Sequence, residues 1–388
     1  MRCGAGWPSI DGVSYGYRAR RRTSARAGQS VAFYQSPLPA PPPPDGRPHV
    51  THGPVPQVLS PAPEAIAEAA ARLRAGGLVA FPTETVYGLG GDAGNAAAVR
   101  RIFEAKGRPA DHPVIVHLAD AGDLAHWARD VPERALALAR AFWPGPLTLI
   151  LPKAGRVLGV VTGGQDSVGL RVPAHPVARA LLAAFAGLGG HGIAAPSANR
   201  FGHVSPTTAA HVADDLGAAV DLILDGGASE VGIESTIVSF AGDVPMLLRP
   251  GGVGPEAIAQ VLGFPLQAAD GSAPRASGTL AAHYAPHTRT LLVPADALNA
   301  MLAQHETRDE RIAVLARSVR EPEGFDGAWI IAPRDPAGYA HALYANLRAL
   351  EASQADVILV ESIPTTPDWL AVRDRLARAT HGEDDDRD

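Results

Sequence analysis

Cysteine, lysine and long apolar runs are all scarce in this chain of 388 residues. Its single cysteine is Cys3, which disfavours a disulfide framework, a cysteine-ligated zinc site and thiol catalysis, and makes a reducing cytoplasm the simplest setting. No uninterrupted apolar run approaches the roughly 20 residues of a membrane span, so no membrane contact is expected. A formal net charge of -6 argues against nucleic-acid binding driven by the charge of the whole chain.

Only two lysines, Lys106 and Lys153, stand beside 32 arginines. Because arginine supplies the generic positive charge, a remaining lysine is a candidate for a specific role. Lys106 and Arg108 lie at the C-terminal edge of a predicted helix that Asn95 begins and Gly107 ends, where they can simply neutralise the helix terminus. A lysine point charge beside an arginine fork also suits a polyphosphate. We expect alanine at either position to reduce turnover with little effect on melting, since cations in loops seldom hold a core together.

The pattern of apolar residues divides the chain into five segments. Residues 1–57 are rich in arginine and proline and lack periodicity, which predicts disorder, and the acidic residues 381–388 are predicted to be a solvated tail. Residues 58–263 interleave helices with short strands and a hairpin, which predicts an open α/β domain with a twisted mixed sheet. Residues 264–287 have the composition of a linker, and residues 288–380 predict a smaller, mostly parallel, Rossmann-like α/β domain.

Common catalytic signatures are missing, and small polar residues after strands take their place. Neither "GLGGDA" (88–93) nor "GLGGHG" (187–192) is positioned as a dinucleotide loop, and no P-loop, zinc-protease or G-x-S-x-G motif occurs. Loops such as "PTET" (82–85), "PSAN" (196–199) and "IEST" (233–236) follow or precede predicted strands instead. Because loops at one end of an α/β sheet can converge on one crevice, we predict that these do.

Each candidate residue also has an ordinary structural interpretation. His117 sits mid-strand, where a core histidine with satisfied hydrogen bonds is equally expected, and Arg171 on an apolar strand needs an anion that a structural carboxylate would supply as well. Ser205 before Pro206 can be a helix cap. Arg249 can be a surface charge at the end of a strand.

The ordered series of motifs resembles the YrdC-like family. It consists of "PTETVYGLG", "KGRP", "PVIVH", "WPGPLT", "GLRVP", "PSAN", "STIV" and "LLRPG", and "HYAP" follows in the linker. The resemblance spans about residues 64–287 by motif and reaches near residue 380 by architecture. Together with the second α/β domain, these motifs are similar to the two-domain, long form of the family, the L-threonylcarbamoyladenylate synthases. Each motif alone is weak, but the ordered series is specific.

This resemblance implies a nucleotidyltransferase that joins L-threonine, bicarbonate and ATP to give threonylcarbamoyl-AMP and pyrophosphate. The product passes to a transferase complex that modifies adenosine 37 of tRNAs reading ANN codons, with weak tRNA contact by the synthase itself. Mg²⁺ is expected on the phosphates of ATP, without metal ligands from protein side chains. The linker is expected to fold over the cavity as a lid that shields labile intermediates from water.

The resemblance also carries roles to individual positions. Catalysis is implied for Lys106 and Arg108. L-threonine contacts are implied for Thr85, His117, Arg171, Ala195 and Ser235. ATP contacts are implied for Arg108, His112, Ser167, Ser197, Ser205, Arg249 and Tyr284, although the family usually has asparagine where this chain has His112, which would make that contact sensitive to pH.

Two other functions compete with the synthase at this level. One is a double-stranded RNA-binding or translation-associated module, which the net charge of -6 weakens. The other is a carbamoyl-transfer enzyme that shares the domain, which the lack of an acylphosphatase-like or zinc-finger segment weakens. Pyrophosphate release that depends on threonine and bicarbonate separates the synthase from both.

Overall fold

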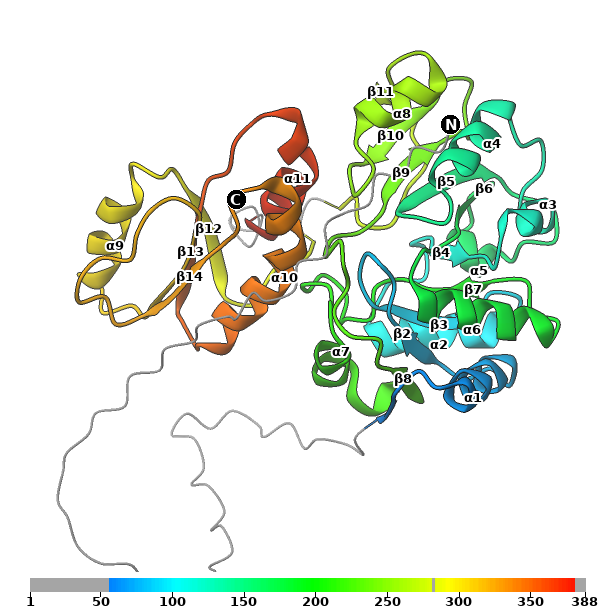
Figure 1. Cartoon of the computed structure of the whole chain (residues 1–388), viewed down its shortest axis with the longest axis horizontal. Coiled ribbons are helices and arrows are strands. Elements are labelled where there is room, and N and C mark those ends of the chain that lie inside the picture. Colours follow the sequence, from blue (N-terminus) through cyan, green and yellow to red (C-terminus); the bar gives the residue numbers. More distant parts are fainter. Residues whose placement is uncertain (1–55, 281–282, 381–388) are drawn as a thin grey trace, which may run out of the picture. The chain divides into compact units, whose positions relative to one another are not determined.

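Two β-sheets organise the chain in the computed structural model, which describes residues 56–280 and 283–380 (Figure 1). All but the last two positions of the predicted disordered extension lie outside the described residues, as does the whole predicted acidic tail. Gln57, assigned above to the extension, is the first residue of the first strand. Within the two described ranges, no helix combines the length and apolar character needed to cross a bilayer.

The first sheet has eleven strands and is mixed, which confirms the predicted fold class. Parallel pairs such as β4 with β6 alternate with antiparallel pairs such as β5 with β6, and the predicted hairpin is the antiparallel pair of β9 with β10. In spatial order the strands are β1 (Gln57–Leu59), β8 (Leu222–Leu224), β2 (Val79–Phe81), β3 (Gly88–Asp92), β7 (Ile193–Ala194), β4 (Ile115–His117), β6 (Ser167–Arg171), β5 (Leu147–Pro152), β9 (Thr236–Ser239), β10 (Met246–Arg249) and β11 (Gln267–Ala268).

Local signals in the sequence fix several helix ends. The side chain of Asn95 accepts hydrogen bonds from the N–H groups of Ala97 and Ala98, and Gly107 ends the same helix with a φ of 64°. The helices of this domain are α1 (Pro63–Arg74), α2 (Ala96–Lys106), α3 (Leu124–Trp127), α4 (Glu133–Phe142), α5 (Gly159–Thr162), α6 (Pro176–Gly187), α7 (Ala209–Leu216) and α8 (Pro255–Leu262), with short 3₁₀ turns at Ala121–Asp123 and Gly217–Ala219.

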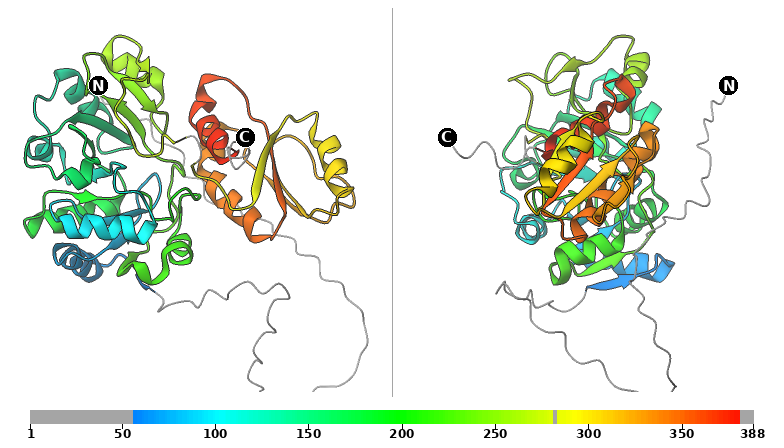
Figure 2. Two further views of the ribbon diagram at one scale, coloured as in Figure 1. Left: turned by 180° about the vertical axis from the view of Figure 1, so that it is seen from behind. Right: turned by 90° about the vertical axis from the view of Figure 1, so that its left-hand side faces the viewer.

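Alternation along the strands sends side chains to cores on both faces of the sheet. In β2, Val79 and Phe81 pack with α1 and α6, whereas Ala80 between them packs with α2 on the opposite face. Accordingly α6 lies in front of the sheet in Figure 1, and α2 lies in front of it in the view from behind in Figure 2. The strand ends between these two layers are left free to carry a site.

Strand β3 was not predicted, because three of its five residues are glycine and glycine disfavours strands. The structure explains its composition. A Cβ at Gly90 would lie 2.8 Å from the ring of Phe81 and 2.9 Å from Ile193, so only glycine fits between the two neighbouring strands. Backbone pairing with β2 and β7 holds the strand in place.

The second sheet belongs to the smaller α/β domain and is entirely parallel, as predicted. Its strands, in spatial order, are β12 (Arg289–Val293), β15 (Val357–Glu361), β13 (Ile312–Ala316) and β14 (Ala328–Ile331). Helix α9 (Leu298–Glu306) covers one face, and α10 (Pro336–Ala352) and α11 (Leu370–Thr380) cover the other, with a 3₁₀ turn at Pro367–Trp369 before α11 (Figure 1, Figure 2).

Candidate active site

A cavity lies at the ends of β4 and β6. The loop after β2 with the start of β3, the loops after α2 and β7, the segment before β9, the end of β10 and the linker complete its lining. The structure therefore brings together the loops that were predicted to converge. Of the thirteen residues assigned a role from the sequence, nine line this cavity: Thr85, Arg108, His117, Arg171, Ala195, Ser197, Ser235, Arg249 and Tyr284.

Four predicted site residues, Lys106, His112, Ser167 and Ser205, do not line the cavity. Ser167 is buried at the start of β6, opposite Pro152 of β5. The imidazole of His112 packs edge-on against the ring of Phe201, with 5.4 Å between ring centroids. Partial burial, followed by the positive charge of Arg108, lowers the pKa of His112.

Ser205 supports the cavity wall from behind. Its hydroxyl donates a hydrogen bond of 2.6 Å to a carboxylate oxygen of Glu234, which does line the cavity. The alternative interpretation of Ser205 as a helix cap is wrong, because α7 begins at Ala209 and Thr208 caps it.

Lys106 is a buried helix residue rather than a loop cation. Its ammonium donates to the backbone carbonyl oxygens of Ser197, at 2.6 Å, and Asn199, at 2.5 Å. Burial, followed by the positive charge of Arg108, lowers its pKa well below the ordinary value. Lys106 therefore ties the end of α2 to the "PSAN" loop. The small effect on melting was expected because Lys106 was taken for a loop cation, and that premise is wrong.

Arg171 is held by a buried carboxylate, Glu84. Its Nη2 lies 2.6 Å from Glu84 Oε1, its Nη1 donates to Thr85 Oγ1 at 2.9 Å, and its Nε donates to the carbonyl of Gly145 at 3.2 Å. Arg171 therefore has the structural carboxylate partner considered above, and it also lines the cavity. Since a guanidinium has five N–H donors and these contacts use three, two remain for a ligand.

His117 is not a satisfied core histidine. Its Nδ1 is buried without a hydrogen-bond partner among the described residues, and its ring is edge-on to Phe81 with centroids 6.2 Å apart. Burial, followed by the positive charge of Arg171, lowers the pKa of His117 to about 3. The imidazole is therefore neutral at pH 7, and Nδ1 is available to a ligand in the cavity.

We expect the protein to lose stability in mild acid through His117 and His283. Burial lowers the pKa of each to about 3, below the ordinary 6.5. Between these two values the unfolded chain binds protons at these histidines and the folded chain does not. Stability present above pH 6.5 is lost as the pH falls from 6.5 toward 3, by about 1.4 kcal/mol per histidine between pH 7.5 and 5.5. Urea unfolding at both pH values measures the loss. His117→Gln should remove about half of the part due to these two residues, whereas an undiminished loss would contradict the assignment. The matched control is His287→Gln, because that ring is largely exposed.

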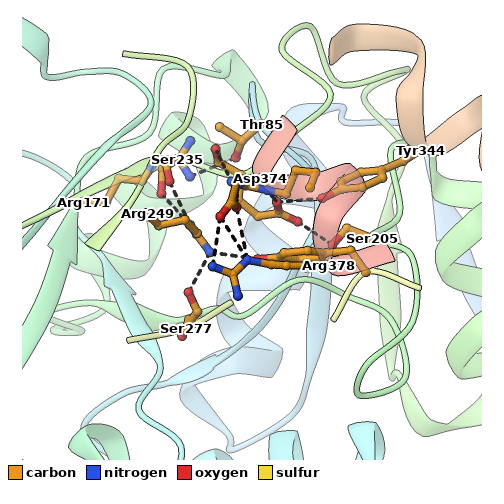
Figure 3. Close-up of polar contacts among 12 residues, drawn as sticks. Thr85, Arg171, Ser205, Ser235, Arg249, Ser277, Tyr344, Asp374 and Arg378 are labelled. Carbon is orange, nitrogen blue, oxygen red and sulfur yellow. Dashed lines mark hydrogen bonds and ion pairs between the residues drawn. The ribbon is translucent and has the colours of Figure 1, made fainter. Parts of the chain in front are cut away.

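Arg249 is buried in the cavity wall and is not a surface charge at a strand end. Its Nε and Nη2 donate to the carbonyl of Ser235 at 3.1 and 2.9 Å, and its Nη1 donates to the carbonyl of Ser277 at 2.9 Å and to Tyr284 Oη at 3.2 Å (Figure 3). These contacts join the hairpin to the linker and fix the guanidinium at the cavity.

Arg108 is the lining cation with the most unused hydrogen-bonding capacity. Its Nη2 donates to the carbonyl of Pro113 at 2.9 Å, its guanidinium lies over the ring of Phe201 at 5.7 Å, and its Nε is buried without a partner among the described residues. Burial lowers the pKa of Arg108 to about 10, so the group stays charged at pH 7. An orphaned donor on a buried cation that faces a cavity is suited to an anionic ligand.

Part of the linker forms one side of the cavity. Ser277, Gly278, His283 and Tyr284 line it, and the hydroxyl of Ser277 donates to the carbonyl of Pro113 at 2.8 Å. Tyr284 is buried and has a φ of 61°, which is rare for a residue with a large side chain. The linker thus reaches the cavity as predicted, while its movement as a lid stays a prediction.

We expect Gly278→Ala to disturb the cavity strongly. Gly278 has a φ of 76°, and a Cβ there would overlap the hydroxyl of Tyr284 and approach Nη1 of Arg249. Relieving the overlap must displace the tyrosine, and such overpacking costs about 1–3 kcal/mol of unfolding free energy. Thermal melting and turnover should both fall. Gly271→Ala, in the same linker with nothing near its Cβ, is the matched control, and equal behaviour of the two variants would refute this account.

Glu234 is the functional residue that sequence reasoning missed. It lines the cavity, and its carboxylate is bonded by Ser205, Tyr344 and Arg375. Burial alone would raise its pKa, but Arg375, Arg249 and Ser205 outweigh burial and lower the pKa to about 2. The signal in the sequence was an acidic residue, Glu234, between Ile233 and Ser235 in the "IEST" motif.

The lining suits an anionic substrate. Three guanidinium groups, of Arg108, Arg171 and Arg249, face one carboxylate, that of Glu234. The hydroxyls of Thr85, Ser197, Ser235 and Tyr284 add hydrogen-bonding capacity. Positive charge in a buried crevice strengthens the binding of phosphate or carboxylate.

Two family models match the chain. One is described as telomere recombination and matches residues 71–251, and the other is described as threonylcarbamoyl-AMP synthase, C-terminal domain, and matches residues 253–381. The threonylcarbamoyl-AMP synthase of Bacillus subtilis is 41% identical over 329 residues, which cover 82% of this chain and 93% of that protein. The enzyme of the same name from Pyrococcus abyssi is 40% identical over 324 residues, which cover 80% of this chain and 93% of that protein.

A solved structure is similar over both domains. The crystal structure of Pyrococcus abyssi Sua5 complexed with L-threonine matches with a TM-score of 0.77 and 37% sequence identity. The match covers 84% of this chain and 97% of that one. It therefore includes the larger domain, the linker and the smaller domain.

Proposed function

The chain belongs to the threonylcarbamoyl-AMP synthase family, and from this premise we propose that it condenses L-threonine, bicarbonate and ATP to threonylcarbamoyl-AMP and pyrophosphate. The observation that carries the proposal is the cavity, in which three arginines, a neutral histidine and several hydroxyls meet at the strand ends. Such a set binds a carboxylate and a polyphosphate side by side.

The threonine half of the site lies at the ends of β4 and β6. His117 and Arg171 are register partners in these parallel strands, which brings both side chains to one edge of the sheet. Arg171 has two N–H donors for the threonine carboxylate, and His117, Thr85 and Ser235 have groups for the hydroxyl and amine. Ala195 closes the wall between them. The Pyrococcus abyssi protein was crystallised with L-threonine, which supports this half of the proposal.

The nucleotide half lies between α2, the hairpin and the linker. Arg108 lies just after α2 and Arg249 is the last residue of β10, and both line the cavity. Ser197 and Tyr284 line it as well. Lys106 keeps the Ser197 loop in place through its two carbonyl contacts. His112, Ser167 and Ser205 stay predicted nucleotide contacts.

The reaction requires positioning and charge neutralisation more than a protein nucleophile. The threonine amine and bicarbonate combine with loss of water to give a carbamate. An oxygen of that carbamate attacks the α-phosphorus of ATP, the bond to the bridging oxygen breaks, and pyrophosphate leaves with its charge neutralised by Arg108 and Arg249. The linker residues at the cavity exclude water from the labile intermediates.

Mg²⁺ is proposed to arrive with ATP. Among the described residues no group of three or more His, Cys, Asp or Glu is placed to hold a metal ion. The carboxylate on the cavity wall, that of Glu234, is already paired with Arg375. This donor set fits an ion carried by phosphate oxygens and water, which neutralises the triphosphate.

The product is proposed to serve tRNA modification in the cytoplasm. A mixed anhydride of a carbamate and AMP is an activated donor, so a transferase must consume it soon after release. We assign that role to a complex that modifies adenosine 37 of tRNAs reading ANN codons, with at most weak contact between tRNA and this chain.

The test is pyrophosphate release by the purified full chain. With ATP and Mg²⁺ present, release should require both L-threonine and bicarbonate, and mass spectrometry should detect threonylcarbamoyl-AMP. Release without threonine, or tight salt-sensitive RNA binding with no release, would contradict the proposal. Omitting Mg²⁺ should abolish release.

A further inference from the structure

The carboxylate of Glu234 is held by both α/β domains. Ser205 of the larger domain donates to Oε1 at 2.6 Å, and Tyr344 of α10 donates to Oε2 at 2.9 Å; Figure 3 labels these two hydroxyl donors. Arg375 of α11 also donates to Oε2, at 2.7 Å. Arg375 is completely buried. A side chain of the smaller domain therefore ends directly behind the cavity wall.

The same guanidinium also supports the linker. Its central carbon lies 5.3 Å from the centre of the Tyr284 ring, within the range of a cation–π contact. The hydroxyl of Tyr284 in turn accepts a hydrogen bond from Arg249 at 3.2 Å. Arg375 thus touches two lining residues, Glu234 and Tyr284, without lining the cavity itself.

Removing Arg375 would change the partner of a buried carboxylate. A buried charge without a counter-ion is strongly unfavourable, so Glu234 must find another cation. Arg249 is the other arginine whose positive charge acts on Glu234. Its fork would turn from the Ser235 and Ser277 carbonyls toward the carboxylate, and one of the two nucleotide-binding cations would be lost.

We propose that Arg375 is a positioning residue for the synthase reaction, by which the smaller domain keeps Glu234 paired and so keeps Arg249 in its position on the nucleotide side of the cavity. This inference rests on the proposed function for its turnover readout. It gives the smaller domain a direct task in the active site.

Arg348 supplies a matched control within the same chain. It also belongs to the smaller domain, on α10, and it pairs with Asp215 of α7 while donating to the carbonyl of Val204. Neither Arg348 nor Asp215 lines the cavity. Arg348→Met therefore weakens the contact between the domains without exposing Glu234.

The experiment compares Arg375→Met, Arg375→Lys, Arg348→Met and the double variant Arg375→Met/Glu234→Gln in the full chain. Arg375→Met should lower kcat/KM for ATP about 10²-fold, the cost of misplacing a reactive group by about 1 Å. Arg375→Lys should recover part of this loss, and Arg348→Met should stay within about threefold of the parent. The double variant should regain activity over Arg375→Met, because the competing carboxylate is gone.

Two results would overturn the proposal. One is an equal loss of kcat/KM in Arg375→Met and Arg348→Met, and the other is a double variant less active than Arg375→Met. Calorimetric titration with ATP separates this proposal from the proposed function, because Arg375→Met should weaken nucleotide binding and Arg348→Met should not, even if the parent releases no pyrophosphate. Unaltered ATP binding by Arg375→Met would also refute the positioning role.

Discussion

Replacing Arg108 by methionine is expected to lower kcat about 10²- to 10³-fold, the usual effect of losing one preorganised donor to a developing charge. Methionine keeps an apolar stem against Phe201 but removes the guanidinium whose Nε has no hydrogen-bond partner in the described part of the chain. Stability should hardly change, because the carbonyl of Pro113 retains a second donor, the hydroxyl of Ser277. Steady-state kinetics and thermal melting measure the two effects.

The matched control for Arg108 is Arg100→Met. Arg100 is exposed on α2, the helix that ends two residues before Arg108, and its substitution should leave both turnover and melting near the parent values. If Arg108→Met and the parent had comparable kcat values, Arg108 would not be a catalytic residue. A melting loss as large as the activity loss would instead assign Arg108 a structural role.

Lys106→Ala is expected to damage both stability and turnover. The substitution leaves the buried carbonyl of Asn199 and the partly buried carbonyl of Ser197 without their donor. A buried acceptor without a partner costs about 1–3 kcal/mol, so the free energy of unfolding should fall by at least that amount. The Ser197 loop then loses its attachment to α2, and kcat should fall as well. Urea unfolding and kinetics on the same preparation measure both.

Lys153 provides the comparison for Lys106, since it is the only other lysine in the chain and is partly exposed. Lys153→Ala should change the free energy of unfolding by less than about 0.5 kcal/mol. If Lys106→Ala lost turnover at unchanged stability, the sequence-based prediction of a cation that acts in turnover and not in stability would be right, and the two carbonyl contacts would be unimportant for stability.

Much of the fold could be predicted because its signals are local. Asn95 and Gly107 mark the ends of α2 through capping geometry, and a short continuous apolar run identifies a buried strand such as β13. Strand β3 was not predictable in this way. Its glycines are explained by close neighbours from β2 and β7, which are distant in the sequence.

The site was predictable where a residue's chemistry is unusual for its position. Arg171 on an apolar strand and the rare Lys106 both attracted attention, and both make specific buried contacts. The role of Lys106 as a clamp on the "PSAN" loop was not predictable, because its partners are backbone carbonyls. Glu234 was missed for a related reason, since its cations and hydroxyls come from four separate segments.

The pairing of Glu234 with Arg375 also has a consequence in time, because a ribosome makes one long before the other. Arg375 follows Glu234 by 141 residues, and translation at about 5–20 residues per second needs roughly 7–28 s for that distance. For most of this interval, once β11 has been made, the larger domain has all of its strands, but the carboxylate in its cavity wall lacks its principal cation. The last helix of the described chain, α11, therefore adds its support behind a wall whose own residues were synthesised earlier.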